Sequence, residues 1–396
     1  MTSLPLAGIR VLDLSTVLAA PVTATFLGDF GAEVVKVEEP RRGDFTRGTT
    51  PGARSAYWAQ EARNKKSITC DLRTERGQRI VRDLIPHFDV VVTNYRPPTL
   101  RSWGLDPDRL GELAPNTVLV YVTGYGLTGP YSDRGSFDRI ASAFAGLTYV
   151  TGETDREPVR SGYSTIDYMA AYLGAFAVVT ALYHRDTAGG GGQVVDLALY
   201  EAGFRASEDA LAAYATTGRV RERAGNRNAQ IVPASDFTTG DGRRVSIHAG
   251  TDALFRRLSR LMGRPELADS DEYAMRAARA RNAEDLYALI GAWAARYTAD
   301  DLTKLCNEAG IPASPLMSIA DIAADPHYRE RGTLIDVHDP DFGDVLMPAP
   351  LPRLSKTPGS VRSTGPALGA HNPEVYRDIL GLSEDTLAAL AADGVI

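Results

Sequence analysis

The first 38 residues contain two apolar strand-like runs joined by a helix-like run. We predict a buried strand at 9–15 (IRVLDLS), a helix at 21–31 (PVTATFLGDFG) and a second strand at 32–38 (AEVVKVE). Two strands that are joined through a helix lie parallel, and the crossover is right-handed. This unit constrains the fold more than any other feature, because a parallel sheet needs helices on both of its faces.

The same alternation continues to residue 199. The pattern predicts a helix at 75–86, strands at 89–95 and 117–126, a helix at 137–146, a long apolar helix that begins near Asp167, and a strand at 193–199. We therefore expect an α/β protein with a Rossmann-like, doubly wound parallel sheet.

The second half of the chain has a different character. A polar segment at 218–230 is typical of a linker or loop, and a strand pair around 240–244 and several helices follow it. A stretch rich in Pro and Gly at 345–373 is expected to run extended over a surface, and two short helices close the chain. We expect a large domain that begins with 1–215, a small domain at 225–325, and a return segment at 330–396.

Composition excludes several classes of protein. The net charge of −7 and the pI near 5.5 do not favour nucleic-acid binding or a basic membrane surface. The two cysteines are too few for a four-cysteine zinc site, and they are far apart in sequence. The longest apolar run, near 169–183, is broken by Gly174 and is shorter than a typical membrane span. We expect a cytoplasmic protein without a membrane segment.

Known cofactor and hydrolase motifs are missing from the sequence. The first predicted strand leads into STVLAAP rather than a glycine-rich turn, so NAD is not expected, and Glu38 at the end of the second strand is interpreted as an ordinary strand-end residue. No metal-ligand helix motif and no G-x-S-x-G motif occurs, and we expect neither a metal nor a serine nucleophile.

Clusters of basic residues follow consecutive strand units. Because α/β folds bind ligands at the strand ends, these cations suggest a polyphosphate ligand, although each cluster alone also fits a solvated surface. The candidates are Arg41, Arg42, Arg47, Arg63, Lys65, Lys66, Arg73, Arg96 and Arg101.

Asp167 is the one charged residue between 161 and 183. Ser164 and Asp167 have the spacing of a capping box, in which both side chains accept hydrogen bonds from free helix amides. The alternative is a carboxylate nucleophile that the helix N-terminus keeps ionised and that apolar surroundings strip of water. Both interpretations place a carboxylate at the same position, so spacing alone leaves them open.

Taken together, these segments resemble the class III CoA-transferase family, also called the carnitine/bile-acid CoA-transferase superfamily. The resemblance covers nearly the whole chain, and its marks include RNKKSITCDL, NYRPPTLRSWGLD, YVTGYGLTGPY, PVRSGYSTIDYMAAYLGAF and GIPASPLMSIADIAADPHYRERG. Within the family, the sequence looks closest to transferases that act on succinyl-CoA and small dicarboxylates.

The resemblance implies that Asp167 is the catalytic aspartate, which moves CoA from an acyl-CoA to a small carboxylic acid through an aspartyl-CoA thioester. Backbone amides near Asp167 and the 226–230 loop are expected to stabilise oxyanions. The 226–230 loop and Arg160 are candidate partners of a second substrate carboxylate. The candidate CoA-binding residues are Val17, Leu18, Arg42, Arg73, Asn94, Tyr95, Arg96, Arg101 and Phe137.

Two further functions remain as alternatives. Racemases of the family pair the aspartate with a histidine at the start of the preceding helix. Residues 135–138 of this chain, at that place, are Gly-Ser-Phe-Asp, so an α-methylacyl-CoA racemase is disfavoured. A non-catalytic CoA-binding protein, with Asp167 only as a helix cap, is the other alternative.

The family fold also implies how the chain is organised. It implies a large domain built from both chain ends, a smaller inserted α+β domain, and an interlocked homodimer.

Overall fold

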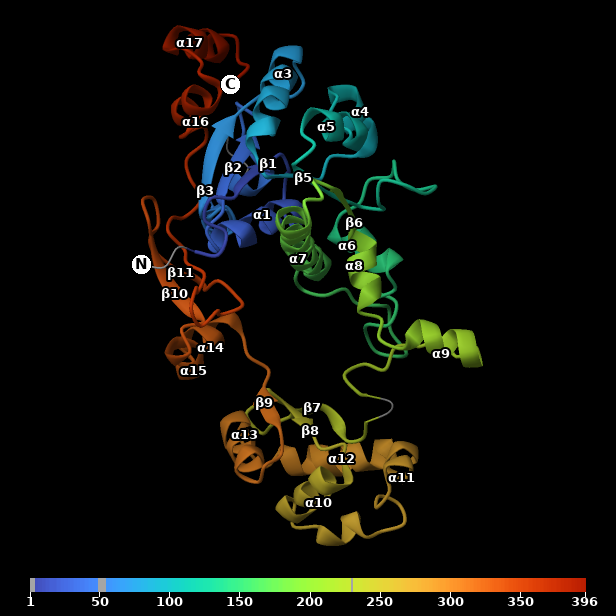
Figure 1. The fold of residues 1–396 in the computed structure, drawn as a ribbon. Coiled ribbons are helices and arrows are strands. Elements are labelled where there is room, and N and C mark those ends of the chain that lie inside the picture. The colour runs from blue at the N-terminus through green and yellow to red at the C-terminus, as the bar shows by residue number, and fades with distance from the viewer. Residues whose placement is uncertain (1–3, 49–54, 229–230) are drawn as a thin grey trace. The chain divides into compact units, whose positions relative to one another are not determined.

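The computed structural model describes residues 4–48, 55–228 and 231–396 (Figure 1). The chain forms two compact units. The first contains Met1–Thr148, Arg160–Ala212 and His327–Ile396, and the second contains Tyr149–Val159 and Ala213–Pro326.

The first unit is built around a six-stranded parallel sheet with the order β3-β2-β1-β4-β5-β6. Its strands are β1 (Arg10–Asp13), β2 (Glu33–Glu38), β3 (Lys65–Thr69), β4 (Val90–Thr93), β5 (Val118–Thr123) and β6 (Val194–Ala198). This is the order of a classical dinucleotide-binding sheet, in which the direction of winding reverses between β1 and β4. The predicted α/β class and the doubly wound parallel sheet are therefore confirmed.

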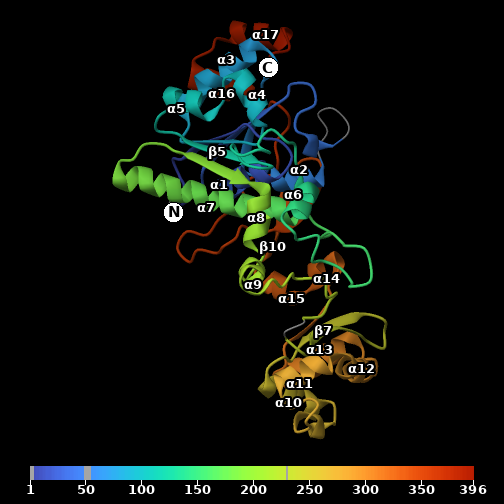
Figure 2. The same ribbon diagram turned by 90° about the vertical axis from the view of Figure 1, so that its right-hand side faces the viewer.

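Helices cover both faces of this sheet (Figures 1 and 2). One face carries α1 (Ala19–Asp29), α6 (Asp138–Phe144), α7 (Thr165–Ala188) and α8 (Leu199–Arg205). The other carries α3 (Glu75–Leu84), α4 (Pro97–Trp103), α5 (Pro107–Leu113), α16 (Asn372–Leu380) and α17 (Glu384–Ala392). The unit also contains α2 (Ala56–Glu61), two short 3-10 turns (Phe45–Arg47 and Ile85–His87), and the hairpin of β10 (Leu334–Asp339) and β11 (Gly343–Pro348).

The two cores follow from the period-2 alternation of the strands. Val11 and Val34 pack toward the α1/α7 face, whereas Leu12 and Val35 pack toward the α3/α16 face. Both sets are buried, as expected for a parallel sheet with two covered faces.

The C-terminal segment completes the core on the α3 face. The hydroxyl of Tyr376 donates to the carbonyl oxygen of Thr69 at 2.7 Å, and the amide of Asp71 donates to the carbonyl oxygen of Val395 at 2.8 Å. Edge strand β3 is thereby covered by chain that lies some 300 residues away in sequence.

The second unit contains a three-stranded antiparallel sheet, with β8 between β7 and β9, and a helical layer. Its elements are β7 (Ala234–Thr238), β8 (Arg244–His248), α10 (Asp252–Leu261), a 3-10 turn (Pro265–Ala268), α11 (Arg276–Arg281), α12 (Ala283–Ala294), α13 (Ala299–Glu308), β9 (Ala313–Pro315) and α14 (Ile319–Ala324). Helices α9 (Ala210–Thr217) and α15 (Pro326–Glu330) lie where the chain passes between units. The predicted strand pair around 240–244 is confirmed.

Helix α7 is longer than the apolar run suggested. It spans 24 residues, and in the described parts of the chain it is the one helix long and apolar enough to cross a membrane. It packs on α1, β5 and β6, as the core helix of a globular domain does. Gly174 permits this packing, since a Cβ there would lie 2.7 Å from the hydroxyl of Thr23 on α1.

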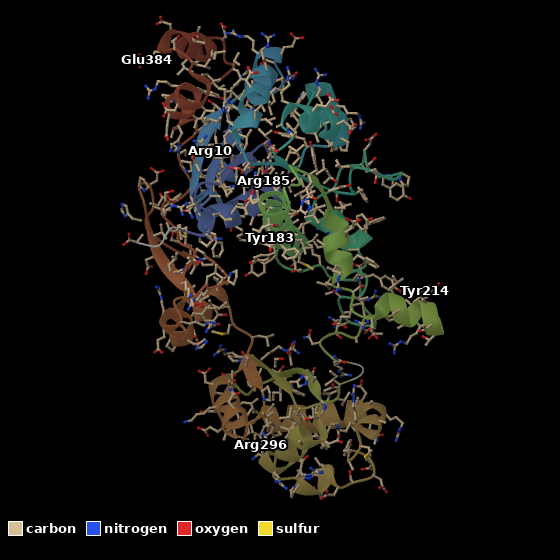
Figure 3. The ribbon with its side chains drawn as sticks, viewed as in Figure 1. Arg10, Tyr183, Arg185, Tyr214, Arg296 and Glu384 are labelled. Carbon is tan, nitrogen blue, oxygen red and sulfur yellow. The ribbon has the colours of Figure 1, made fainter. Side chains whose placement is uncertain are left out.

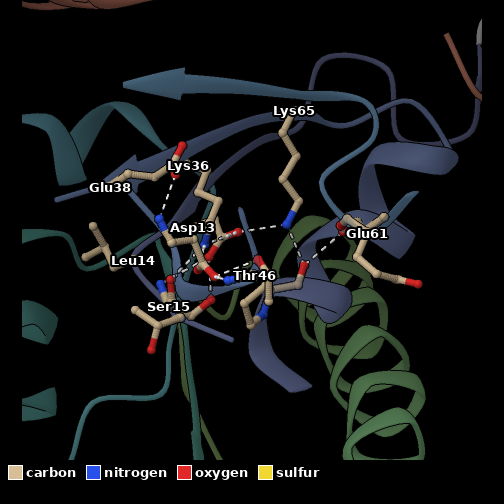
Figure 4. A network of polar contacts seen from close by, with 12 residues as sticks. Asp13, Leu14, Ser15, Lys36, Glu38, Thr46, Glu61 and Lys65 are labelled. Atoms are coloured by element: carbon tan, nitrogen blue, oxygen red, sulfur yellow. Dashed lines mark hydrogen bonds and ion pairs between the residues drawn. The ribbon is translucent and has the colours of Figure 1, made fainter. Parts of the chain in front are cut away.

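The sequence interpretation missed β3, whose two lysines interrupt an apolar pattern. Lys65 is buried because its ammonium group donates to Asp13 at 2.9 Å and to the carbonyl oxygen of Pro21 at 2.6 Å (Figure 4). Lys36 of β2 lies 3.6 Å from the same carboxylate and 3.1 Å from that of Asp44. A network of buried charges therefore lies at the carboxyl end of β1.

We predict that Lys65→Met destabilises the protein by about 3 kcal/mol, because removal of one partner from a buried ion pair leaves the other poorly compensated. Urea unfolding at neutral pH measures the change.

Lys66→Met is the matched control, since this neighbouring lysine is part-exposed and pairs with Glu33 and Glu374. It should cost less than about 1 kcal/mol. Equal effects of the two substitutions would contradict a structural role for the buried network.

Candidate active site

A cavity of about 570 Å³ opens at the carboxyl edge of the sheet, where the direction of winding reverses. Its walls come from the turn after β1 (Thr16–Ala19), the segment after β4 (Asn94–Pro97), the end of β5 and the first turn of α7. Open α/β sheets bind ligands at this crevice. The topology alone therefore makes it the leading candidate for a site.

The turn after β1 has a strained backbone. Val17 has φ of 69°, which is rare for a β-branched residue. Asn94 holds the turn through two hydrogen bonds with the backbone of Thr16, at 2.9 and 2.7 Å. The carboxylate of Asp44 accepts from the amide of Val17 at 3.3 Å. The surrounding contacts, and not local preference, thus fix the turn.

Asp167 lies in the first turn of helix α7 and lines this cavity. The predicted capping box is wrong, because Ser164 makes no side-chain capping bond. Asp138, the first residue of α6, takes that role: its Oδ1 accepts from the amides of Ile166 at 2.9 Å and Asp167 at 3.4 Å. No described residue donates a hydrogen bond to, or forms an ion pair with, the side chain of Asp167. A cap function therefore does not account for this carboxylate.

Burial raises the pKa of Asp167 to about 7, and the negative charge of Asp138 adds to the shift. Burial also raises the pKa of Tyr57, and the charges of Glu61 and Asp167 contribute to that shift. The carboxylate of Asp167 thus lies in a poorly hydrated place beside a second carboxylate. An ionised oxygen in such a place is a strong nucleophile.

The expected oxyanion donors next to Asp167 are already engaged. Besides the two amides that donate to Asp138, the amide of Thr165 donates to the Tyr163 carbonyl and that of Tyr168 to the Ser164 carbonyl. The prediction that backbone amides around Asp167 stabilise oxyanions is wrong for these four positions. Helix α1 has no side-chain cap, and its N-terminal residues Leu18 and Ala19 line the cavity.

The structure brings most of the predicted site residues together. Seven of them line the cavity: Val17, Leu18, Asn94, Tyr95, Arg96, Phe137 and Asp167. Arg42 and Arg73 instead line a separate hollow of about 420 Å³ with Glu39 and Arg41. Arg101 is exposed and lies 3.4 Å from Asp133.

Three of the predicted ligand cations are structural. Arg47 pairs with Glu38 at 2.7 Å, Arg63 with Asp29 at 2.6 Å and Lys65 with Asp13 at 2.9 Å, and all three are buried. The prediction of phosphate contacts is wrong for these residues, because their charged groups are already paired with buried carboxylates.

Three residues at or near the cavity escaped the sequence interpretation. Asp138 was named only within the 135–138 segment that was compared with racemases. Neither Tyr57 nor Arg134, which lines the cavity, was considered. Asp138 lies 29 positions before Asp167, so no local spacing connects them. A polar residue that opens a helix was the one available signal for Asp138.

The structure bears on only one of the suggested partners of a second carboxylate, Arg160. Arg160 is exposed, donates to the Ser161 carbonyl oxygen at 2.9 Å and does not line the cavity. Of the 226–230 loop, residues 229 and 230 lie outside the described residues, and the rest belongs to the second unit.

We predict that Asp167→Asn stabilises the protein at pH 8 but not at pH 4. The pKa of Asp167 is higher in the folded protein than in the unfolded chain. Between pH 4 and 7 the folded protein therefore keeps a proton that the unfolded chain has lost, so the stability of the native protein falls as the pH rises through this range. With allowance for partial solvent access, the gain at pH 8 is on the order of 2 kcal/mol. Urea unfolding at both pH values measures it.

Asp108→Asn removes an exposed carboxylate in the first turn of α5 and serves as the control. Its effect should stay within about 0.5 kcal/mol at either pH. A stability gain for Asp167→Asn that is the same at pH 4 and pH 8 would show that this carboxylate is well solvated.

Comparison with known proteins gives a consistent result. Residues 6–372 match the model of CoA-transferase family III. The chain is 44% identical over 396 residues, 99% of this chain and 98% of the relative, to a succinyl-CoA–D-citramalate CoA-transferase of Chloroflexus aurantiacus. It is 34% identical over 395 residues, 99% of this chain and 90% of the relative, to a succinyl-CoA:glutarate CoA-transferase of Mus musculus. A crystal structure of a CAIB/BAIF family protein from Brucella suis superposes with a TM-score of 0.85 at 33% identity, covering 96% of this chain and all of that one.

Proposed function

The chain belongs to CoA-transferase family III and is a CoA-transferase, and we propose that it works through a covalent intermediate on Asp167. We further propose that succinyl-CoA is the donor and that a small dicarboxylic acid is the acceptor. The names of the relatives support this choice of substrates.

One observation carries the covalent proposal. Asp167 lines the cavity at the switch point, yet its carboxylate has no partner among the described residues, and Asp138 performs the capping that would otherwise explain it. A carboxylate that is kept from water and from cations is costly to the fold. An ionisable group that lowers the stability of the fold in this way is typical of a catalytic site.

The first half of the reaction transfers CoA to the enzyme. A carboxylate oxygen of Asp167 attacks the thioester carbonyl of the donor, the C–S bond breaks, and an acyl-aspartyl anhydride and CoA thiolate result. The thiolate then attacks the aspartyl carbonyl, so that the donor leaves as a free carboxylate and an aspartyl-CoA thioester remains. No proton is gained or lost overall.

The second half reverses these steps with the acceptor. The acceptor carboxylate attacks the aspartyl-CoA thioester, which forms a new mixed anhydride and releases CoA thiolate. Attack of the thiolate on the acceptor's acyl carbon yields the product thioester and restores Asp167. The thioester energy is conserved throughout, since each step exchanges one activated acyl bond for another.

The residues around the cavity suit the remaining tasks. Arg96 is exposed on the cavity wall and suits a CoA phosphate, while Tyr95 and Phe137 offer apolar contact to the pantetheine arm. The backbone amide of Ala19, which lines the cavity at the uncapped start of α1, is the candidate oxyanion donor. Arg42 lies in the separate hollow, where it suits a further phosphate. Arg73 lines the same hollow, but its guanidinium group is already paired with Asp71 and Glu39, each at 2.8 Å.

Two further proposals concern the state of the protein. We infer a homodimer, which is supported by an exposed apolar stripe on α7 that includes Phe176 and Tyr183, 70% and 71% exposed. Figure 3 labels Tyr183 on this helix. A cytoplasmic location is supported by Cys70 and Cys306, which are both free thiols.

We predict that Asp167→Asn lowers the transfer rate by at least about a thousand-fold, because an amide cannot form the anhydride. CoA affinity should persist, since the lining of the cavity is otherwise unchanged. Intact-protein mass spectrometry after incubation with succinyl-CoA should show an added CoA mass on native enzyme and none on the variant.

Asp108→Asn is the control and should retain activity within about two-fold. Near-native transfer by Asp167→Asn, or a CoA adduct on this variant, would remove Asp167 as the nucleophile.

We predict that Asp138→Asn shifts the pH profile of the first half-reaction to lower pH. The native rate should fall as pH drops through about 7, because protonation of Asp167 removes the nucleophile. The substitution deletes the neighbouring negative charge and so lowers the pKa of Asp167, while the amide oxygen still caps α7. The acid limb of kcat/KM measures this shift, and an unmoved limb would contradict the electrostatic role of Asp138.

A further inference from the structure

The loop after β5 carries an arginine that the proposed chemistry does not use. Arg134 lines the same cavity as Asp167. No described residue supplies a carboxylate partner to its guanidinium group, and the adjacent Asp133 is paired with Arg101 at 3.4 Å. The cavity wall therefore presents a cation that remains available to an anion.

The guanidinium group of Arg134 is also oriented. Its central carbon lies 3.6 Å from the centroid of the Tyr131 ring, in the geometry of a cation–π contact. Tyr131 packs edge-on against Tyr125 and Phe144, at centroid distances of 5.9 and 6.1 Å, and Phe144 packs against Tyr200 at 5.0 Å. This aromatic cluster connects the loop to α6 and α8, which limits the rotamers open to the arginine.

The cavity needs such a cation if its substrate is a diacid. The free carboxylate of a dicarboxylic acyl group would enter a space whose reactive end already holds Asp167 with Asp138 beside it. Like charges at this range repel, and burial strengthens the repulsion. An arginine offers a planar pair of donors that matches a carboxylate, which a monocarboxylic acyl group does not require.

We propose that Arg134 binds the free carboxylate of the dicarboxylic acyl group and thereby selects diacids over monoacids. This inference rests on the proposed function. Arg96, the other arginine of the cavity wall, follows β4 and is left for the CoA phosphates.

The test compares two thioesters of equal chain length, succinyl-CoA and butyryl-CoA, which differ in the terminal carboxylate. Single-turnover formation of the enzyme–CoA adduct is followed by intact mass. For Arg134→Gln we expect a roughly 30-fold slower reaction with succinyl-CoA, an unchanged reaction with butyryl-CoA and an unchanged Kd for free CoA. Arg134→Lys keeps the positive charge but loses the planar pair of donors, so its rate with succinyl-CoA should lie between those of the native enzyme and Arg134→Gln.

Arg160→Gln is the matched control, because Arg160 is an exposed arginine of the same unit that does not line the cavity. It should leave both rates unchanged. Loss of succinyl selectivity in this variant alone would assign the second carboxylate to Arg160 and overturn the inference.

Other results would also overturn it. An equal fall with both thioesters, or a weaker Kd for free CoA, would make Arg134 a contact of CoA itself. Equal rates of the native enzyme with both thioesters would exclude a binding site for the second carboxylate. The proposed function would not be affected by that result. Absence of any adduct with either thioester would instead refute the covalent function, and this inference with it.

Discussion

The pairing of Asp13 with Lys36 and Lys65 beneath the carboxyl edge of the sheet is the interaction on which the site depends. Burial alone would raise the pKa of Asp13, but the two ammonium groups lower it to about 2, so the carboxylate stays ionised. Lys36 also donates to the carbonyl oxygen of Ser15 at 2.8 Å and contacts Asp44, which in turn holds the amide of Val17. These contacts join strands β1, β2 and β3 to the strained turn after β1, and this turn forms part of the cavity wall.

The contrast between Asp13 and Asp167 shows how one fold gives the same side chain two roles. Both carboxylates are removed from water, but Asp13 has two cations and Asp167 has a second carboxylate as its neighbour. The first arrangement stabilises the charge and the fold, whereas the second leaves the charge poorly compensated and reactive. Asp138 connects structure and chemistry, since it anchors the N-terminus of α7 and at the same time raises the pKa of Asp167.

Positioning of Asp167 also depends on the packing of two helices. Gly174 lets α7 approach Thr23 of α1, and Leu18 packs with Ala171 one turn beyond the nucleophile. The turn after β1 and the start of α7 therefore pack directly against each other. Such close packing holds reacting groups in a fixed geometry, which is worth more to catalysis than any single hydrogen bond.

The sequence by itself determined the parallel α/β sheet, the helices around it and the importance of Asp167, because periodicity and an isolated charge in an apolar helix are local signals. The sequence analysis wrongly predicted Arg47, Arg63 and Lys65 as phosphate ligands. The identity of a basic residue does not show whether its side chain is exposed to solvent or paired with a buried carboxylate. Only the tertiary structure decided that Asp138, and not Ser164, caps α7, and that Arg134 shares a cavity with Asp167. These relations join residues that are tens of positions apart, and the energy of such a contact depends on distance in space, which no spacing along the chain encodes.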